Sequence, residues 1–184
     1  LGMGPLLEGL RLGNTALSPF RDRAPKVAGS KLAGIVAEFS ARDVDKRLDF
    51  KSLTRIGRHA VAAARFALAD AGLRLGPREG LETGVVHGVC IGTSEEEYMR
   101  LITRSNGAEA DIGGFASIVP NATGGWISSL LALKGYSCTT AMGADAGLFA
   151  IALARLAVKS LSTSRVLAGG ADELYPQYIL NCQA

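Results

Sequence analysis

The sequence predicts an α/β protein in which strands and helices alternate along one domain. Residues 85–91 form a run rich in β-branched side chains, which is typical of a strand. Residues 137–142 predict another strand, and this strand leads directly into an apolar helix expected over residues 145–159. The regular alternation of the two element types places the chain in the α/β class.

The remaining elements rest on local signals. A helix is expected over residues 54–72, and residues 93–96 fit a capping box that opens a helix through about Arg104. Residues 106–114 predict a loop, after which Asn121 or Thr123 caps a helix that runs through Leu133. Residues 165–169 predict the last strand, and Gly76-Pro77 predicts a surface turn.

The helix over residues 145–159 is the most apolar of these elements. Its apolar side chains point in most directions, so we expect it to be covered nearly all round and to lie at the centre of the fold.

Composition limits the class of protein. With 184 residues, 48% hydrophobic, and a mean hydropathy of +0.21, the chain can bury a real core as one domain. The longest nearly apolar run, residues 148–158, contains Arg155 and is shorter than the about 20 residues that span a bilayer. The start of the sequence carries no pattern of a signal peptide. A net charge of +3 without alternating aromatic and basic residues does not indicate a nucleic-acid partner.

The three cysteines, Cys90, Cys138 and Cys182, are widely separated and odd in number. They indicate neither a disulfide framework nor a CxxC metal site, so we expect no bound metal. A reducing cytoplasm fits this pattern best.

The segment of residues 135–147 is the most informative part of the chain. It predicts a strand that runs through a turn of small residues into a helix. Such a turn can present a Cys or Ser nucleophile, because unpaired N–H groups and positive potential at the helix start stabilise a thiolate or an oxyanion. In this chain the turn holds Ala144.

Three other residues compete for a catalytic role. Cys138 lies six residues before Ala144 inside the predicted strand, away from the helix start, and we interpret it as a buried structural residue. Cys90, in another apolar strand, receives the same interpretation. Asp145 begins the helix, where Asp is more often a cap than a catalytic carboxylate.

The order of these segments resembles the β-ketoacyl synthases of the thiolase superfamily. Residues 135–147 are followed by Leu148-Phe-Ala-Ile-Ala-Leu-Ala-Arg155 and then by Arg165-Val-Leu-Ala-Gly-Gly-Ala-Asp-Glu173. Further segments in family order are residues 33–39, the helix 54–72, the strand 88–92 and Pro120-Asn121 before a helix that ends at Lys134-Gly135. The resemblance covers nearly the whole chain. It implies the N-terminal half of a thiolase-like fold, with a mixed sheet sandwiched by helices around a buried central helix.

The resemblance also implies what the chain lacks. In the family, the glycine that matches Gly147 follows the catalytic Cys by three residues, so the nucleophile position falls on Ala144 and no catalytic residue is expected here. The two active-site His residues belong to the family's second half, and neither His59 nor His87 matches them. We therefore expect residues 1–184 to form a ketosynthase-like N-terminal domain without its first strand and without the C-terminal half.

Basic residues point to a protein partner. The segment ahead of the 54–72 helix docks the acidic acyl carrier protein in condensing enzymes, and Arg47, Lys51 and Arg55 are the candidate docking residues here. The alternative is a solvated charged face in which basic residues alternate with acidic ones. The basic residues in this stretch are Arg42, Lys46, Arg47, Lys51, Arg55 and Arg58, and the acidic ones are Asp43, Asp45 and Asp49. No cofactor of the chain itself is implied, since the phosphopantetheine arrives on the carrier protein.

The resemblance further assigns a tunnel and a dimer strand. Phe115, Ile118 and Val119, with Trp126 on the next helix, are candidates for the wall of an acyl tunnel, and ordinary core packing is the alternative for each. The strand that pairs across the dimer two-fold is expected to contain Ser137, Cys138, Thr139 and Thr140.

Three functions remain open. The first is a non-catalytic subunit similar to the chain-length factors, which often carry Gln at the Cys position. Such subunits support decarboxylative Claisen condensation of acyl and malonyl carrier-protein thioesters in fatty acid, polyketide or polyene biosynthesis. The second is a divergent or engineered β-ketoacyl synthase that retains malonyl decarboxylation. The third, a nucleotide-binding α/β domain, is disfavoured because no GxGxxG or GxxxxGK[ST] follows a strand. We favour the first, with a Cys-bearing ketosynthase or a second copy as the partner.

Overall fold

The computed structural model describes residues 3–19, 32–34, 36, 39–46, 53–93, 116–160 and 162–174. The chain divides into two compact units, residues 1–39 with 174–184 and residues 40–173. Among the described helices, none combines the length and the apolar character that a membrane span requires.

The first unit contains a helix and a small strand pair. Helix α1 (Met3–Arg11) is followed by β1 (Leu17–Pro19) and β2 (Leu32–Gly34), which pair antiparallel with Leu17 opposite Gly34. The apolar side chains of α1 follow a helical spacing and are all exposed; they are Met3, Leu6, Leu7 and Leu10.

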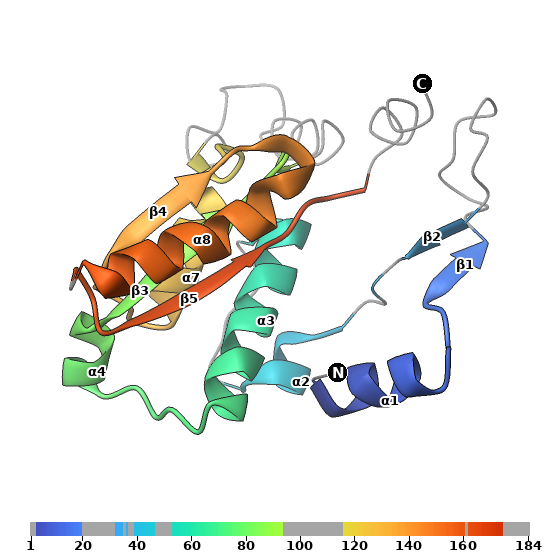
Figure 1. The fold of residues 1–184 in the computed structure, drawn as a ribbon, viewed down its shortest axis with the longest axis horizontal. Helices are drawn as coiled ribbons and strands as arrows, with labels where there is room; N and C mark the ends of the chain where they lie inside the picture. Colours follow the sequence, from blue (N-terminus) through green and yellow to red (C-terminus); the bar gives the residue numbers. More distant parts are fainter. Residues whose placement is uncertain are drawn as a thin grey trace, which may run out of the picture. The chain divides into compact units, whose positions relative to one another are not determined.

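The second unit is built on a three-stranded parallel sheet with the order β4-β3-β5 (Figure 1). The strands are β3 (Thr83–Gly88), β4 (Ser137–Thr140) and β5 (Arg165–Gly170). The helices are α2 (Ala41–Val44), α3 (Arg55–Asp70), α4 (Pro77–Leu81), α7 (Ala122–Leu130) and α8 (Ala146–Lys159), with a short 3₁₀ turn, η1 (Gly143–Asp145), before α8. The sequence predicted a mixed sheet, whereas this described sheet is parallel throughout.

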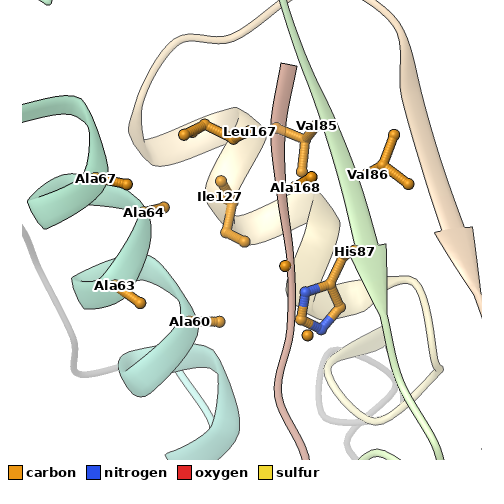
Figure 2. A pocket seen from close by; sticks show the side chains of 12 residues that line it. Ala60, Ala63, Ala64, Ala67, Val85, Val86, His87, Ile127, Leu167 and Ala168 are labelled. Carbon is orange, nitrogen blue, oxygen red and sulfur yellow. The ribbon is translucent and has the colours of Figure 1, made fainter. Parts of the chain in front are cut away.

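Helices cover the two faces of this sheet. Helix α8 packs along all three strands on one face, where Ala150 and Ala154 meet Val86. On the other face, α3 and α7 pack against each other, and α7 contacts β3 while α3 contacts β5 (Figure 1). Because side chains alternate along a strand, Val85 and His87 of β3 point to this second face (Figure 2).

Local signals explain where α3 begins and ends. The Thr54 hydroxyl accepts a hydrogen bond of 3.2 Å from the Gly57 N–H, which satisfies one unpaired donor of the first turn. At the other end, Gly72 adopts φ +64°, and the Leu73 N–H returns to the Leu68 carbonyl at 3.0 Å. A glycine is suited to this left-handed position, so the helix ends here.

The described elements confirm the α/β prediction but change several bounds. Strand β3 ends at Gly88, α7 ends at Leu130, and β4 ends at Thr140, each a few residues before the predicted end. The surface turn predicted at Gly76-Pro77 is instead the start of α4, because Pro fits the first helical position and Glu79 accepts from the Gly76 N–H. The helix predicted from residue 93 and the loop over 106–114 lie outside the described residues.

Candidate functional site

Ala144 lies in η1, between the end of β4 and the start of α8. Its side chain is exposed, and Gly143 before it adopts φ +64°, which turns the chain from the strand into the helix. The first N–H groups of α8 lack partners within the helix and carry positive potential. The position therefore suits a nucleophile, but a methyl group supplies none.

Glycines at the strand ends allow α8 to start close to the sheet. A Cβ on Gly88 would collide with the backbone carbonyl of Ala146, and a Cβ on Gly170 would lie 3.1 Å from Gly147 Cα. The Thr140 hydroxyl donates to the Ala146 carbonyl at 3.3 Å. These contacts fix the start of α8 over the carboxyl ends of the strands.

Asp172 joins the loops that follow β3 and β5, a role that no sequence pattern predicted. Its carboxylate accepts hydrogen bonds from the N–H groups of Cys90 at 2.6 Å, Ile91 at 2.9 Å and Gly92 at 2.8 Å. Three converging donors hold the two loops together at the strand ends where α8 begins. The only available signal was an Asp two residues after Gly170.

The structure changes the interpretation of the catalytic competitors. Asp145 occupies the cap position of α8, as predicted. Its side chain, however, makes no capping hydrogen bond. Cys138 and Cys90 are half-buried rather than buried. Cys138 packs against the cluster of Val86 and Ala150 on the α8 face. It is only half-buried because its strand, β4, lies at the edge of the described sheet.

Cys138 also interacts with Tyr136. A hydrogen bond with Cys138, followed by the charge of its thiolate, raises the pKa of the Tyr136 phenol. The thiol therefore belongs to the environment of β4 and not to the turn that holds Ala144.

The predicted docking segment is only partly described. Arg47 and Lys51 lie outside the described residues, whereas Arg55 is half-buried in the first turn of α3. Asp45 forms an ion pair with Arg65 of α3 at 2.9 Å. The N–H and hydroxyl of Ser40 bond Asp43, at 2.7 Å and 2.9 Å, and hold the pKa of this carboxyl below its ordinary value.

The predicted tunnel residues fall in different places. Phe115 lies outside the described residues, while Ile118 and Val119 are half-buried in the turn before α7. The ring of Trp126 lies beside Gly57 of α3, 3.5 Å from where a Cβ on that glycine would stand. The tunnel assignment stays a prediction for all four residues.

The predicted dimer strand is β4. It pairs with β3 through Ser137, Cys138, Thr139 and Thr140, and no other described strand lies on its opposite edge. Ser137 is exposed and Thr140 is buried.

His87, which was predicted to match no catalytic position of the family, is the one buried histidine among the described residues. Burial lowers the pKa of its imidazole, and the negative charge of Asp172 partly opposes this shift. The ring lines a pocket between α3 and the sheet (Figure 2).

Together, these elements define a thiolase-like α/β domain of the ketosynthase type. The chain belongs to the beta-ketoacyl synthase family, because the model of the "Beta-ketoacyl synthase, N-terminal domain" matches residues 9–184. No curated protein matches the sequence.

Solved structures show the same fold. The ishigamide ketosynthase/chain length factor aligns with a TM-score of 0.79 at 21% identity over 98% of this chain. A beta-ketoacyl synthase from Burkholderia phymatum STM815 gives 0.76 at 24% identity over 96%. AntDE:AntF, a type II PKS acyl-carrier protein in complex with its ketosynthase, gives 0.64 at 21% identity over 80%. This chain spans 46%, 44% and 43% of those chains, less than half of each.

Proposed function

We propose that the chain forms part of a ketosynthase-like, non-catalytic subunit of the chain-length-factor type. Such a subunit supports decarboxylative Claisen condensation of acyl and malonyl carrier-protein thioesters in fatty acid, polyketide or polyene biosynthesis. The observation that carries the proposal is Ala144 in the turn before α8, where the family resemblance assigns the nucleophilic Cys. A methyl group cannot accept an acyl group, so the chain cannot form the thioester intermediate at this position.

In this proposal a Cys-bearing ketosynthase partner, or a second copy if the chain pairs with itself, completes the assembly. The partner's thiolate takes the acyl group from one carrier protein, whose phosphopantetheine thiol leaves. The carbanion formed by loss of CO2 from malonyl carrier protein then attacks this thioester and displaces the partner's thiolate. The present chain shapes the acyl tunnel with Phe115, Ile118, Val119 and Trp126. The edge of β4 that no described strand occupies pairs across the two-fold. The scattered cysteines favour a cytoplasmic location.

The docking of an acidic carrier protein is proposed for Arg47, Lys51 and Arg55. Two neighbouring carboxylates have partners of their own, because Asp45 pairs with Arg65 and Asp43 bonds Ser40. They are therefore less able to neutralise the basic stretch. This supports docking over a merely solvated charged face, and it predicts binding that weakens as salt concentration rises.

The main test is an acyl-transfer experiment on the natural full-length protein, alone and together with the ketosynthase that copurifies with it. Radiolabelled acyl carrier protein should label the partner's cysteine and leave this chain unlabelled. Labelling of Cys138 would overturn the proposal. Release of CO2 from malonyl carrier protein by the protein alone would favour the alternative, a divergent ketosynthase with residual decarboxylation.

A second experiment tests the geometry at residue 144 without any assay of activity. We expect the thiol of Ala144→Cys to react with iodoacetamide near neutral pH about tenfold faster than that of Ala141→Cys, because a helix start lowers a thiol pKa. Ala141 is a matched control, since it is also exposed but precedes η1. Equal rates would show that the helix start does not act on residue 144.

Docking is tested separately by charge reversal. We expect Arg47→Glu with Lys51→Glu to weaken binding of the carrier protein about tenfold at low salt, with a smaller effect at high salt. Arg74→Glu is the control, because Arg74 is exposed beyond the opposite end of α3. Equal losses in both variants would contradict this docking site.

A further inference from the structure

A pocket of about 230 Å³ lies between α3 and the sheet (Figure 2). Its walls are almost entirely apolar. Helix α3 contributes Ala60, Ala63, Ala64 and Ala67, and the other side includes Val85, Leu167 and Ile127. The one titratable side chain in the lining is His87, at the end of β3.

The pocket exists because the facing residues are small. Alanines on α3 leave space that larger side chains would fill, and His87 is paired in register with Gly169 of β5. A Cβ on Gly169 would have no atom within 4 Å, which shows independently that the space beside His87 is open. A side chain at position 169 would therefore fill part of the pocket.

His87 brings an unsatisfied polar group to this apolar space. The residue is only 3% exposed, and its Nε2 atom has no hydrogen-bond partner among the described residues. A buried ring nitrogen without a partner is unfavourable, so a ligand that bonds it gains more than one that merely fills space. Burial lowers the pKa of the imidazole, against the effect of Asp172, which favours the neutral ring near pH 7.

We propose that this pocket binds a small, uncharged, mainly apolar molecule with one hydroxyl group, of about the size of phenol, whose hydroxyl bonds His87 Nε2. A hydroxyl both donates and accepts, so it satisfies either tautomer of a neutral imidazole. The size follows from the volume, because an apolar cavity of about 150 Å³ already holds benzene. An ion is disfavoured, because the lining would remove its hydration without supplying a directly facing counter-charge.

The experiment compares two probes on the natural full-length protein, 4-fluorophenol and fluorobenzene, by titration followed with ¹⁹F NMR. We expect 4-fluorophenol to bind about tenfold more tightly, the ratio expected for one net hydrogen bond. His87→Leu should abolish this preference while retaining binding of fluorobenzene. Gly169→Val should remove binding of both probes by filling the pocket. Gly125→Ala is the control, because Gly125 is exposed on α7 and its substitution also meets open space.

Three outcomes would overturn the proposal: no binding of either probe, equal affinity for both, or undiminished binding to Gly169→Val. If a variant does not fold, the wild-type protein still decides the question. With ¹⁵N-labelled histidine, saturating 4-fluorophenol should shift the Nε2 resonance of His87, and an unchanged resonance would refute the hydrogen bond. Because the pocket lies on the opposite sheet face from α8, these results are independent of the function proposed for Ala144.

Discussion

Helices α3 and α8 cover opposite faces of the same sheet, but α3 buries large apolar side chains whereas α8 exposes them. Helix α3 buries Val61 and Leu68, which is 1% exposed, within the unit. Helix α8 buries only alanines, while Leu148 and Leu156 are 71% and 61% exposed. Small side chains let α8 approach the strands closely, and its large apolar side chains form a face that the described residues leave uncovered.

This difference corrects the prediction that the helix after residue 145 is covered nearly all round. One face of α8 meets the sheet, and the other has no described partner. A large apolar face of this kind is a surface for association.

The largest expected effect comes from comparing leucines on the two helices. Leu68→Ala should lower the free energy of unfolding by about 2–5 kcal/mol, because it leaves a cavity in a packed core. Leu156→Ala should change it by no more than about 0.5 kcal/mol in residues 1–184 alone. Urea unfolding measures both. A cost near that of Leu68→Ala for Leu156→Ala in the natural protein would show that another surface covers α8.

The next test compares glycines at the two sheet faces. Gly88→Ala should cost about 3 kcal/mol, because its Cβ would collide with the backbone at the start of α8. Gly169→Ala should cost less than about 1 kcal/mol, since its Cβ meets open space on the pocket side. Equal costs in urea unfolding would contradict the close approach of α8 to β3.

The pH dependence of stability tests the environment of His87. The unfolded chain protonates this histidine near pH 6.5, whereas the folded protein keeps it neutral to lower pH. Acidification below that value therefore favours the unfolded state, by up to about 1.4 kcal/mol per pH unit. Urea midpoints measured from pH 7.5 down to about pH 5 should fall less steeply for His87→Gln than for wild type.

A control for this test is His59→Gln, which removes the other histidine and leaves His87 in place. It should keep the wild-type pH dependence that His87 contributes. If His87→Gln and wild type lose stability in parallel on acidification, His87 is not buried in the folded protein.

The smallest effect distinguishes the starts of the two helices. Thr54→Ala should cost about 1 kcal/mol, because its hydroxyl caps α3 by accepting from the Gly57 N–H. Asp145→Ala should cost about 0.5 kcal/mol, through loss of its charge near the helix dipole alone, since it makes no capping bond. Thermal unfolding of the two variants would measure the difference, and a larger loss for Asp145→Ala would reverse the assignment.

Local patterns predicted most of the described second unit. The β-branched run at β3, the apolar run of α8 and the Thr54 cap each act within a few residues, so the sequence shows them directly. Helix α4 was missed because Gly76-Pro77 is compatible with both a turn and a helix start. Asp172 was missed because its three donors lie about 80 residues earlier in the chain.

The sequence by itself determined the α/β class, the family resemblance and the alanine in the turn before α8, because these depend on the order of residues and on spacing. Only the tertiary structure decided that α8 turns its alanines to the sheet and that His87 faces a pocket opposite Gly169. Those features depend on which distant segments pack together. Packing depends on the shapes of both surfaces, which no single stretch of sequence contains.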